Sequence, residues 1–95
     1  MARWLIQRRL TQNSARLKRL RAELAQVDEQ MLHFESDADD TAIRALVSET
    51  PGASQEANEA RKHAEAMAKH RRYVVATIAE IEARQDELLD QLGSG

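Results

Sequence analysis

The stretch Glu49-Thr50-Pro51-Gly52-Ala53-Ser54 stands at the middle of a 95-residue chain and decides its fold. Pro51 and Gly52 are the only proline and glycine between residues 2 and 92. The flanking segments are dominated by alanine, leucine, arginine, glutamate, glutamine and lysine, which lose the least free energy on entering a helix. Proline beside glycine is a strong turn signal. The sequence therefore predicts an all-α fold in which two long helices fold back on each other at Pro51 and Gly52.

The lengths of the two segments predict a single helical hairpin over residues 1–95. We expect helix 1 at about 3–49, the turn at 50–53, helix 2 at about 54–92 and a frayed tail at 93–95. Either Thr50 or Ser54 can cap the second helix. If Thr50 is the cap, Pro51 takes the first helical position, where its missing N–H has no helical partner to lose. Several N-cap residues in 36–40 also predict a kink, stutter or fresh helix start near residues 37–40.

Each predicted helix carries one narrow apolar stripe in a seven-residue frame, which is the pattern of an antiparallel coiled coil. Asn13 interrupts the stripe of the first helix, and Arg71 and Gln85 interrupt that of the second. Near the turn the frame holds small residues, namely Ala38, Thr41, Ala45, Ala57, Ala60 and Ala64. The large residues of the predicted seam are Leu10, Leu17, Leu20, Leu24, Val27, Met31, Phe34, Met67, Val74, Ile78, Ile81, Leu88 and Leu92.

Charge alternates along the chain in a way that fits the hairpin. Residues 1–22 contain seven arginines and lysines and no acid, whereas residues 73–95 contain five acids against one arginine. Folding the chain at Pro51 lays these blocks side by side, and opposite charges favour that register. The same register places Arg71 on the seam within reach of Asp28 or Glu35, and His33 roughly across from His70.

Two helices make a thin core, so we expect this hairpin to bind a partner. Large apolar side chains outside the seam supply a second contact surface. The simplest use of that surface is a homodimer in which two hairpins form a four-helix bundle, and docking of another protein is the alternative. The residues of the predicted surface are Trp4, Leu5, Leu32, Ile43, Leu46, Val47, Val75 and Leu89.

The sequence offers little for catalysis. The chain is far shorter than a barrel enzyme, has no cysteine, and places His33, His63 and His70 in no zinc or di-iron motif. We therefore expect no catalytic residue, metal or cofactor. No apolar run approaches the ~20 residues of a membrane span, and the absence of cysteine suits a reducing compartment. We expect a soluble, cytoplasmic protein.

The best functional hypothesis is a non-catalytic interaction, scaffold or adaptor protein that self-associates and presents its turn or its basic end to a protein partner. The alternative is a nucleic-acid or anionic-membrane binder, because Trp4 and its apolar neighbours are flanked by arginines near the N-terminus. The net charge of −2 argues against general nucleic-acid binding. The basic contact residues of this alternative are Arg3, Arg8, Arg9, Arg16 and Arg19.

Two resemblances bear on these hypotheses. The acidic turn, with Glu49, Glu56 and Glu59, resembles the coiled-coil fingers of factors that enter the secondary channel of bacterial RNA polymerase. That likeness implies a regulator that inserts a hairpin tip, although those factors carry a further globular or zinc-bearing domain. The chain also resembles a group of small uncharacterised bacterial coiled-coil proteins with the same turn, which implies no activity. This second resemblance is carried by Arg44-Ala45-Leu46-Val47-Ser48-Glu49-Thr50-Pro51, His63-Ala64-Glu65-Ala66-Met67-Ala68-Lys69-His70 and Arg84-Gln85-Asp86-Glu87-Leu88-Leu89-Asp90.

Overall fold

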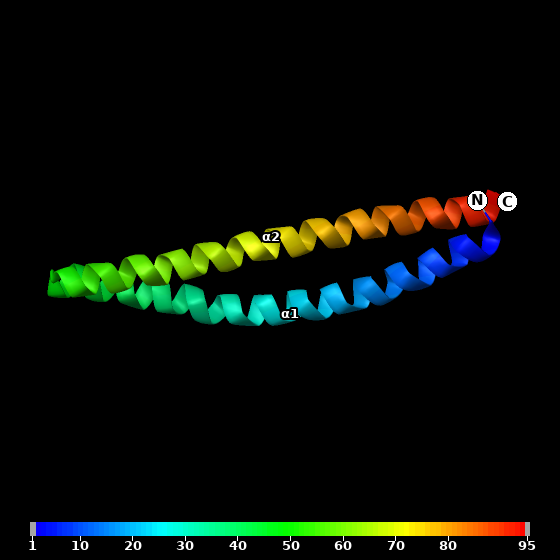
Figure 1. Cartoon of the computed structure of the whole chain (residues 1–95). Helices are drawn as coiled ribbons and strands as arrows, with labels where there is room; N and C mark the ends of the chain where they lie inside the picture. Colours follow the sequence, from blue (N-terminus) through cyan, green and yellow to red (C-terminus); the bar gives the residue numbers. More distant parts are fainter. Residues whose placement is uncertain (1, 95) are drawn as a thin grey trace. The chain divides into compact units, whose positions relative to one another are not determined.

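The computed structural model describes residues 2–94, and nearly all of them are helical. Helix α1 spans Arg3–Ser48 (46 residues) and helix α2 spans Pro51–Ser94 (44 residues) (Figure 1). No strand occurs among the described residues. The predicted all-α helical hairpin is confirmed. Neither helix holds, within this described part, a segment that is both long and apolar enough to cross a membrane.

The paired helices divide into two compact units. The turn unit, Ala25–Arg72, contains the second half of α1, the turn and the first half of α2. The terminal unit combines the stretch of α1 that ends at Leu24 with the stretch of α2 that begins at Tyr73. In each unit a segment of α1 lies beside a segment of α2 that runs in the opposite direction (Figure 1). The sequence predicted the antiparallel pairing but not this division.

The chain reverses at Glu49 and Thr50, not at the predicted residues 50–53. Glu49 has a left-handed backbone (φ 53°), and its N–H donates to the carbonyl oxygen of Ala45 at 3.2 Å, which forms a left-handed C-cap of α1. The hydroxyl of Thr50 accepts a hydrogen bond from the N–H of Ala53 at 3.2 Å and so caps α2. Pro51 therefore occupies the first helical position, and α2 begins three residues before the expected residue 54.

Three other helix boundaries differ from expectation. The first helix ends at Ser48, one residue before the expected residue 49, because Glu49 leaves the helical conformation. The second continues through Gly93 to Ser94, where a frayed tail was expected from residue 93, and Gly95 lies outside the described residues. No fresh helix begins near residues 37–40, where α1 runs on without a break. The buried Thr41 lies on this stretch and its hydroxyl donates back to the carbonyl of Asp37 at 2.8 Å.

Every residue of the predicted seam is buried or half-buried. In the terminal unit, Leu17, Val74, Ile78 and Ile81 form a buried cluster, with Leu20 and Leu24 packed against it. In the turn unit the small residues Thr41 and Ala60 are 2% and 5% exposed. Small side chains let α1 and α2 approach closely, so even these short side chains are shielded from water.

Polar groups on and beside the seam match the predicted register. In the terminal unit, the side-chain amide of Gln85 donates to Ser14 Oγ at 3.0 Å and to the Leu10 carbonyl at 3.2 Å. Arg21 and Glu82 lie 3.8 Å apart in the same unit, and both side chains are more than half exposed. Such exposed pairs add little stability, so they mainly favour one register over another.

Substitutions at the turn test where it lies. A Cβ added at Gly52 meets no atom within 4 Å, and Gly52 has no positive φ. We expect Gly52→Ala to raise the free energy of unfolding by roughly 0.5–1 kcal/mol, because alanine favours the helix. We expect Glu49→Gly to raise it by a similar amount, roughly 0.5–1 kcal/mol, because glycine adopts the left-handed conformation without strain. Urea unfolding followed by circular dichroism measures both.

Gly93→Ala is the matched control, since Gly93 is also helical and unobstructed but lies in the last turn of α2. We expect a smaller effect there because helix ends fray. A loss of stability in Gly52→Ala would show that the reversal needs a glycine at position 52.

Candidate interaction surfaces

The largest exposed apolar feature of the turn unit lies at the end of α1. Ile43, Leu46 and Val47 are 60%, 79% and 80% exposed, and we call these three residues the turn patch. Their i, i+3, i+4 spacing puts them on one face of the helix. Ile43 lies two residues from both Thr41 and Ala45 of the seam, which is about 200° around the helix. The turn patch therefore faces away from α2.

Acidic side chains border the turn patch. Asp39 and Asp40 lie four and three residues before Ile43, on the same face, and both are exposed. Arg44, a nearby cation, is already paired with Glu56 of α2 at 3.5 Å. The patch is thus apolar with an acidic border on its N-terminal side.

Leu32 is also exposed in the turn unit, at 71%, but it is separate from the turn patch. It lies eleven residues before Ile43, and the polar Ser36, Asp39 and Asp40 occupy the face between them. A lone exposed leucine is common on protein surfaces and has no functional meaning by itself.

In the terminal unit, an exposed aromatic side chain stands at the start of α1. Trp4 is 64% exposed, whereas Ile6, two residues later, is buried. Leu5 is half-buried, and Arg8 follows Trp4 at i+4 on the same outer face. We call Trp4, Leu5 and Arg8 the Trp4 patch. It combines an apolar surface with a cation.

The other predicted surface residues lie on α2 of the terminal unit. Val75 and Leu89 are 39% and 54% exposed, and their separation of two seven-residue repeats places them on the same side of α2. Tyr73 is 64% exposed and was missed by the sequence analysis. Its position directly before the seam residue Val74 was the available signal, since adjacent residues point about 100° apart around a helix and the other neighbour, Arg72, is also exposed.

All five predicted basic contact residues are exposed: Arg3, Arg8, Arg9, Arg16 and Arg19. Two of them line shallow grooves together with acids of α2. Arg9 lies in a groove with Glu87, and Arg16 lies in another with Glu80. Part of the basic charge therefore has acidic neighbours within the terminal unit.

On the seam of the turn unit, Arg71 is paired with Asp28. Its Nε donates to Asp28 Oδ1 at 2.5 Å, and both side chains are more than a third exposed. This hydrogen bond and the negative charge of Asp28 raise the pKa of the Arg71 guanidinium. Of the two acids that the register placed within reach, the structure selects Asp28. With this carboxylate already bound, Arg71 is a poor candidate for an anion site.

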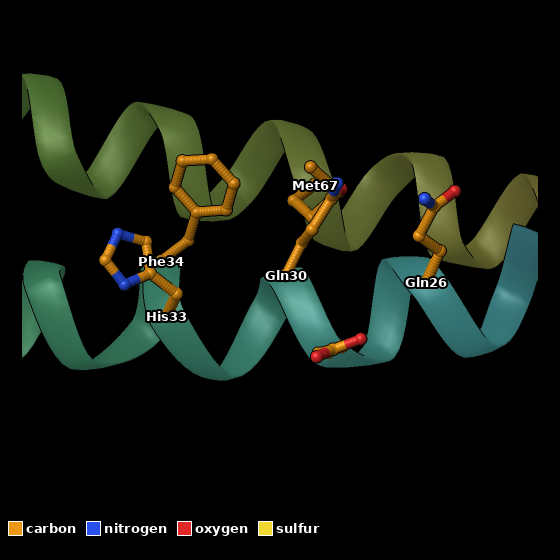
Figure 2. Close-up of a pocket in the computed structure, with 6 residues that line it drawn as sticks. Gln26, Gln30, His33, Phe34 and Met67 are labelled. Carbon is orange, nitrogen blue, oxygen red and sulfur yellow. The ribbon is translucent and has the colours of Figure 1, made fainter.

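A shallow groove of about 530 Å³ lies beside Phe34 in the turn unit. Figure 2 shows the Phe34 ring pointing from α1 towards α2, where Met67 lines the same groove. His33 meets Phe34 edge-on with ring centroids 6.0 Å apart, and His63 stacks on Phe34 at 6.2 Å. The groove is widely open, and its other lining residues are Gln26, Glu29 and Gln30. It lacks the enclosure of a small-molecule site.

Two of the three histidines contact the same aromatic ring. His33 from α1 and His63 from α2 both lie against Phe34. Among the described residues, no group of three or more histidine, cysteine, aspartate and glutamate side chains is placed to hold a metal ion. The turn patch and the Trp4 patch remain the best candidates for a functional surface.

Comparison with known proteins adds no further guide to function. No protein-family model, curated protein or solved structure matches this chain. The two patches must therefore be interpreted from their own chemistry.

The turn patch should be unnecessary for folding. We expect Leu46→Gln and Val47→Gln, made together and studied at low protein concentration, to change the free energy of unfolding by less than about 0.5 kcal/mol, because both side chains already face solvent. Val27→Ala, at a 4%-exposed position of the same unit, should cost roughly 1–3 kcal/mol. Urea unfolding compares the variants, and a large loss in the double variant would mean that the turn patch is part of the core.

Proposed function

We propose that this chain is a non-catalytic coiled-coil interaction protein that associates with itself and holds a protein partner on its exposed surfaces. The observation that carries the proposal is the turn patch. Three large apolar side chains, each at least 60% exposed, lie together on the face of α1 opposite its seam. Contiguous exposed apolar side chains are typical of protein–protein contacts.

The small core supports the same proposal. Each helix buries one narrow stripe, and the buried cluster of the terminal unit is formed by Leu17, Val74, Ile78 and Ile81. Chains that bury so little apolar surface commonly gain stability by association. Two hairpins that meet through their outer faces would place four helices around one contact, as in a four-helix bundle. We also propose a cytoplasmic location, because a sequence without cysteine suits a reducing compartment. From the resemblance above we propose a bacterial origin.

Sedimentation equilibrium over a wide range of protein concentrations tests self-association. We expect the average mass of the wild-type chain to rise above the 10.8 kDa of one chain as concentration increases. Leu46→Gln with Val47→Gln should hold the mass near 10.8 kDa, because the contact loses its apolar centre. Leu32→Gln is the matched control, an exposed leucine of the same unit that lies outside the patch. A wild-type chain that stays monomeric at all concentrations contradicts self-association.

A second candidate function is supported by the basic start of α1. An exposed Trp4 beside Arg3 and Arg8 has the composition of a segment that binds an anionic membrane or nucleic-acid phosphates. If this function is correct, the chain binds acidic vesicles or RNA at low ionic strength and is released as salt is added, because binding displaces counterions. Arg3→Gln with Arg8→Gln should weaken binding several-fold, and a wild-type chain that binds neither probe at low salt rules this candidate out.

A further inference from the structure

We propose that the Trp4 patch and the turn patch are the two halves of one contact between copies of this chain. In this contact, Trp4 and Leu5 of one copy pack on Ile43, Leu46 and Val47 of a second copy, and Arg8 lies against Asp39 and Asp40. The inference rests on the self-association proposed above and names the surfaces that produce it. Two unlike surfaces meet in each such contact.

Charge favours the pairing of unlike patches. Residues 3–22 of α1 contain seven cations and no acid, whereas the turn patch is bordered by Asp39 and Asp40. Two turn patches packed together would gather four aspartates around one contact, and two Trp4 patches would gather arginines. Like charges brought together at an interface disfavour association, and opposite charges favour it. Each patch therefore fits the other better than it fits itself.

The order of residues along the helix fixes the direction of the contact. In the Trp4 patch the apolar residues precede the cation, since Arg8 follows Trp4 by four residues. In the turn patch the acids come first, with Asp39 four residues before Ile43. Two helices that run in opposite directions therefore bring apolar residues against apolar residues and the arginine against the aspartates at the same time. Parallel helices would direct Arg8 past the turn patch and away from both aspartates.

The spacings also agree. From Trp4 to Arg8 the helix rises about 6 Å, and from the middle of the turn patch near residue 45 to Asp40 it rises about 7–8 Å. An arginine side chain spans this difference readily. In both patches the opposite face of α1 is already occupied by α2, since Ile6 is buried in the terminal unit and Thr41 in the turn unit. The contact therefore brings four helices together locally.

Pairing of unlike surfaces allows two forms of assembly. After one such contact has formed, a turn patch on one copy and a Trp4 patch on the other are still available. If these two patches also meet, the dimer is closed; if they do not, further copies can add to form open chains or closed rings. The contact involves few side chains and belongs with the small, weak interfaces. Assembly should therefore depend on protein concentration and weaken as salt screens the charged pair.

Mixing two complementary variants tests this contact. Trp4→Gln with Arg8→Gln removes one half, and Leu46→Gln with Val47→Gln removes the other; all four side chains are exposed, and circular dichroism checks that both variants fold. We expect each variant alone to sediment at 10.8 kDa even where the wild-type chain assembles. An equimolar mixture should give a species of twice that mass and nothing larger, because only one productive pair of patches remains.

Three other results would each overturn the inference, for different reasons. If Trp4→Gln with Arg8→Gln assembles as the wild type does, self-association stands but another surface produces it. If both variants stay monomeric in the mixture while the wild type assembles, the patches do not bind each other. If the wild-type chain is monomeric throughout, self-association itself fails, and this contact fails with it.

Spin labels test the direction of the helices in the same mixture. The chain has no cysteine, so a single Thr11→Cys can be labelled in the variant that keeps the Trp4 patch, and Ser36→Cys in the variant that keeps the turn patch. Both positions are exposed on α1 and lie beyond the charged residues of their patches. Antiparallel packing brings them close together, so we expect strong dipolar coupling. A doubled mass without coupling between these labels would overturn the antiparallel contact.

Discussion

A helix that packs against a single neighbour buries one stripe of its surface and leaves the rest to water. This constraint governs the chain, because the residues of the stripe recur every seven positions in both helices and become Leu17, Val74, Ile78 and Ile81 of the buried cluster. Once the stripe is occupied, any other large apolar residue must be exposed. Ile43, Leu46 and Val47 are exposed for this reason, and the contact that we propose would cover them.

The sequence predicted the seam well because periodicity reports directly on burial in a two-helix fold. Every predicted seam residue is at least half-buried, and the pairing of Arg71 with Asp28 follows from the same register. Two residues mark the limits of the pattern. Thr77 is 9% exposed although it lies outside the predicted frame, because a stripe on a real helix is wide enough to include a flanking position. Tyr73, which the predicted surface did not include, is 64% exposed because its place on the helix lies outside the stripe.

The turn could not be placed from composition alone. Pro51 and Gly52 mark the middle of the chain, yet both belong to α2, and the left-handed residue is Glu49. Proline suits the first position of a helix as well as a turn, so the signal locates a helix start and not the reversal itself. The hydroxyl of Thr50 accepts a hydrogen bond from the N–H of Ala53, and this cap makes Pro51 a helix start and not part of the turn. A local hydrogen bond of this kind cannot be recognised from the periodicity of the sequence. Likewise, the division into two units depends on contacts that periodicity does not report.

The separation of the seam from the exposed patches also bears on function. Two residues along a helix turn a side chain by about 200°, so Ile43 and Thr41 lie on opposite sides of α1 although they are close in sequence. Changes on the outer face should therefore leave the fold intact, and the same holds for Trp4 beside the buried Ile6. In the contact that we propose, no pocket or catalytic group is needed for specificity. Specificity would come from the order of charges and apolar residues along an exposed helix face, which the second copy matches in reverse.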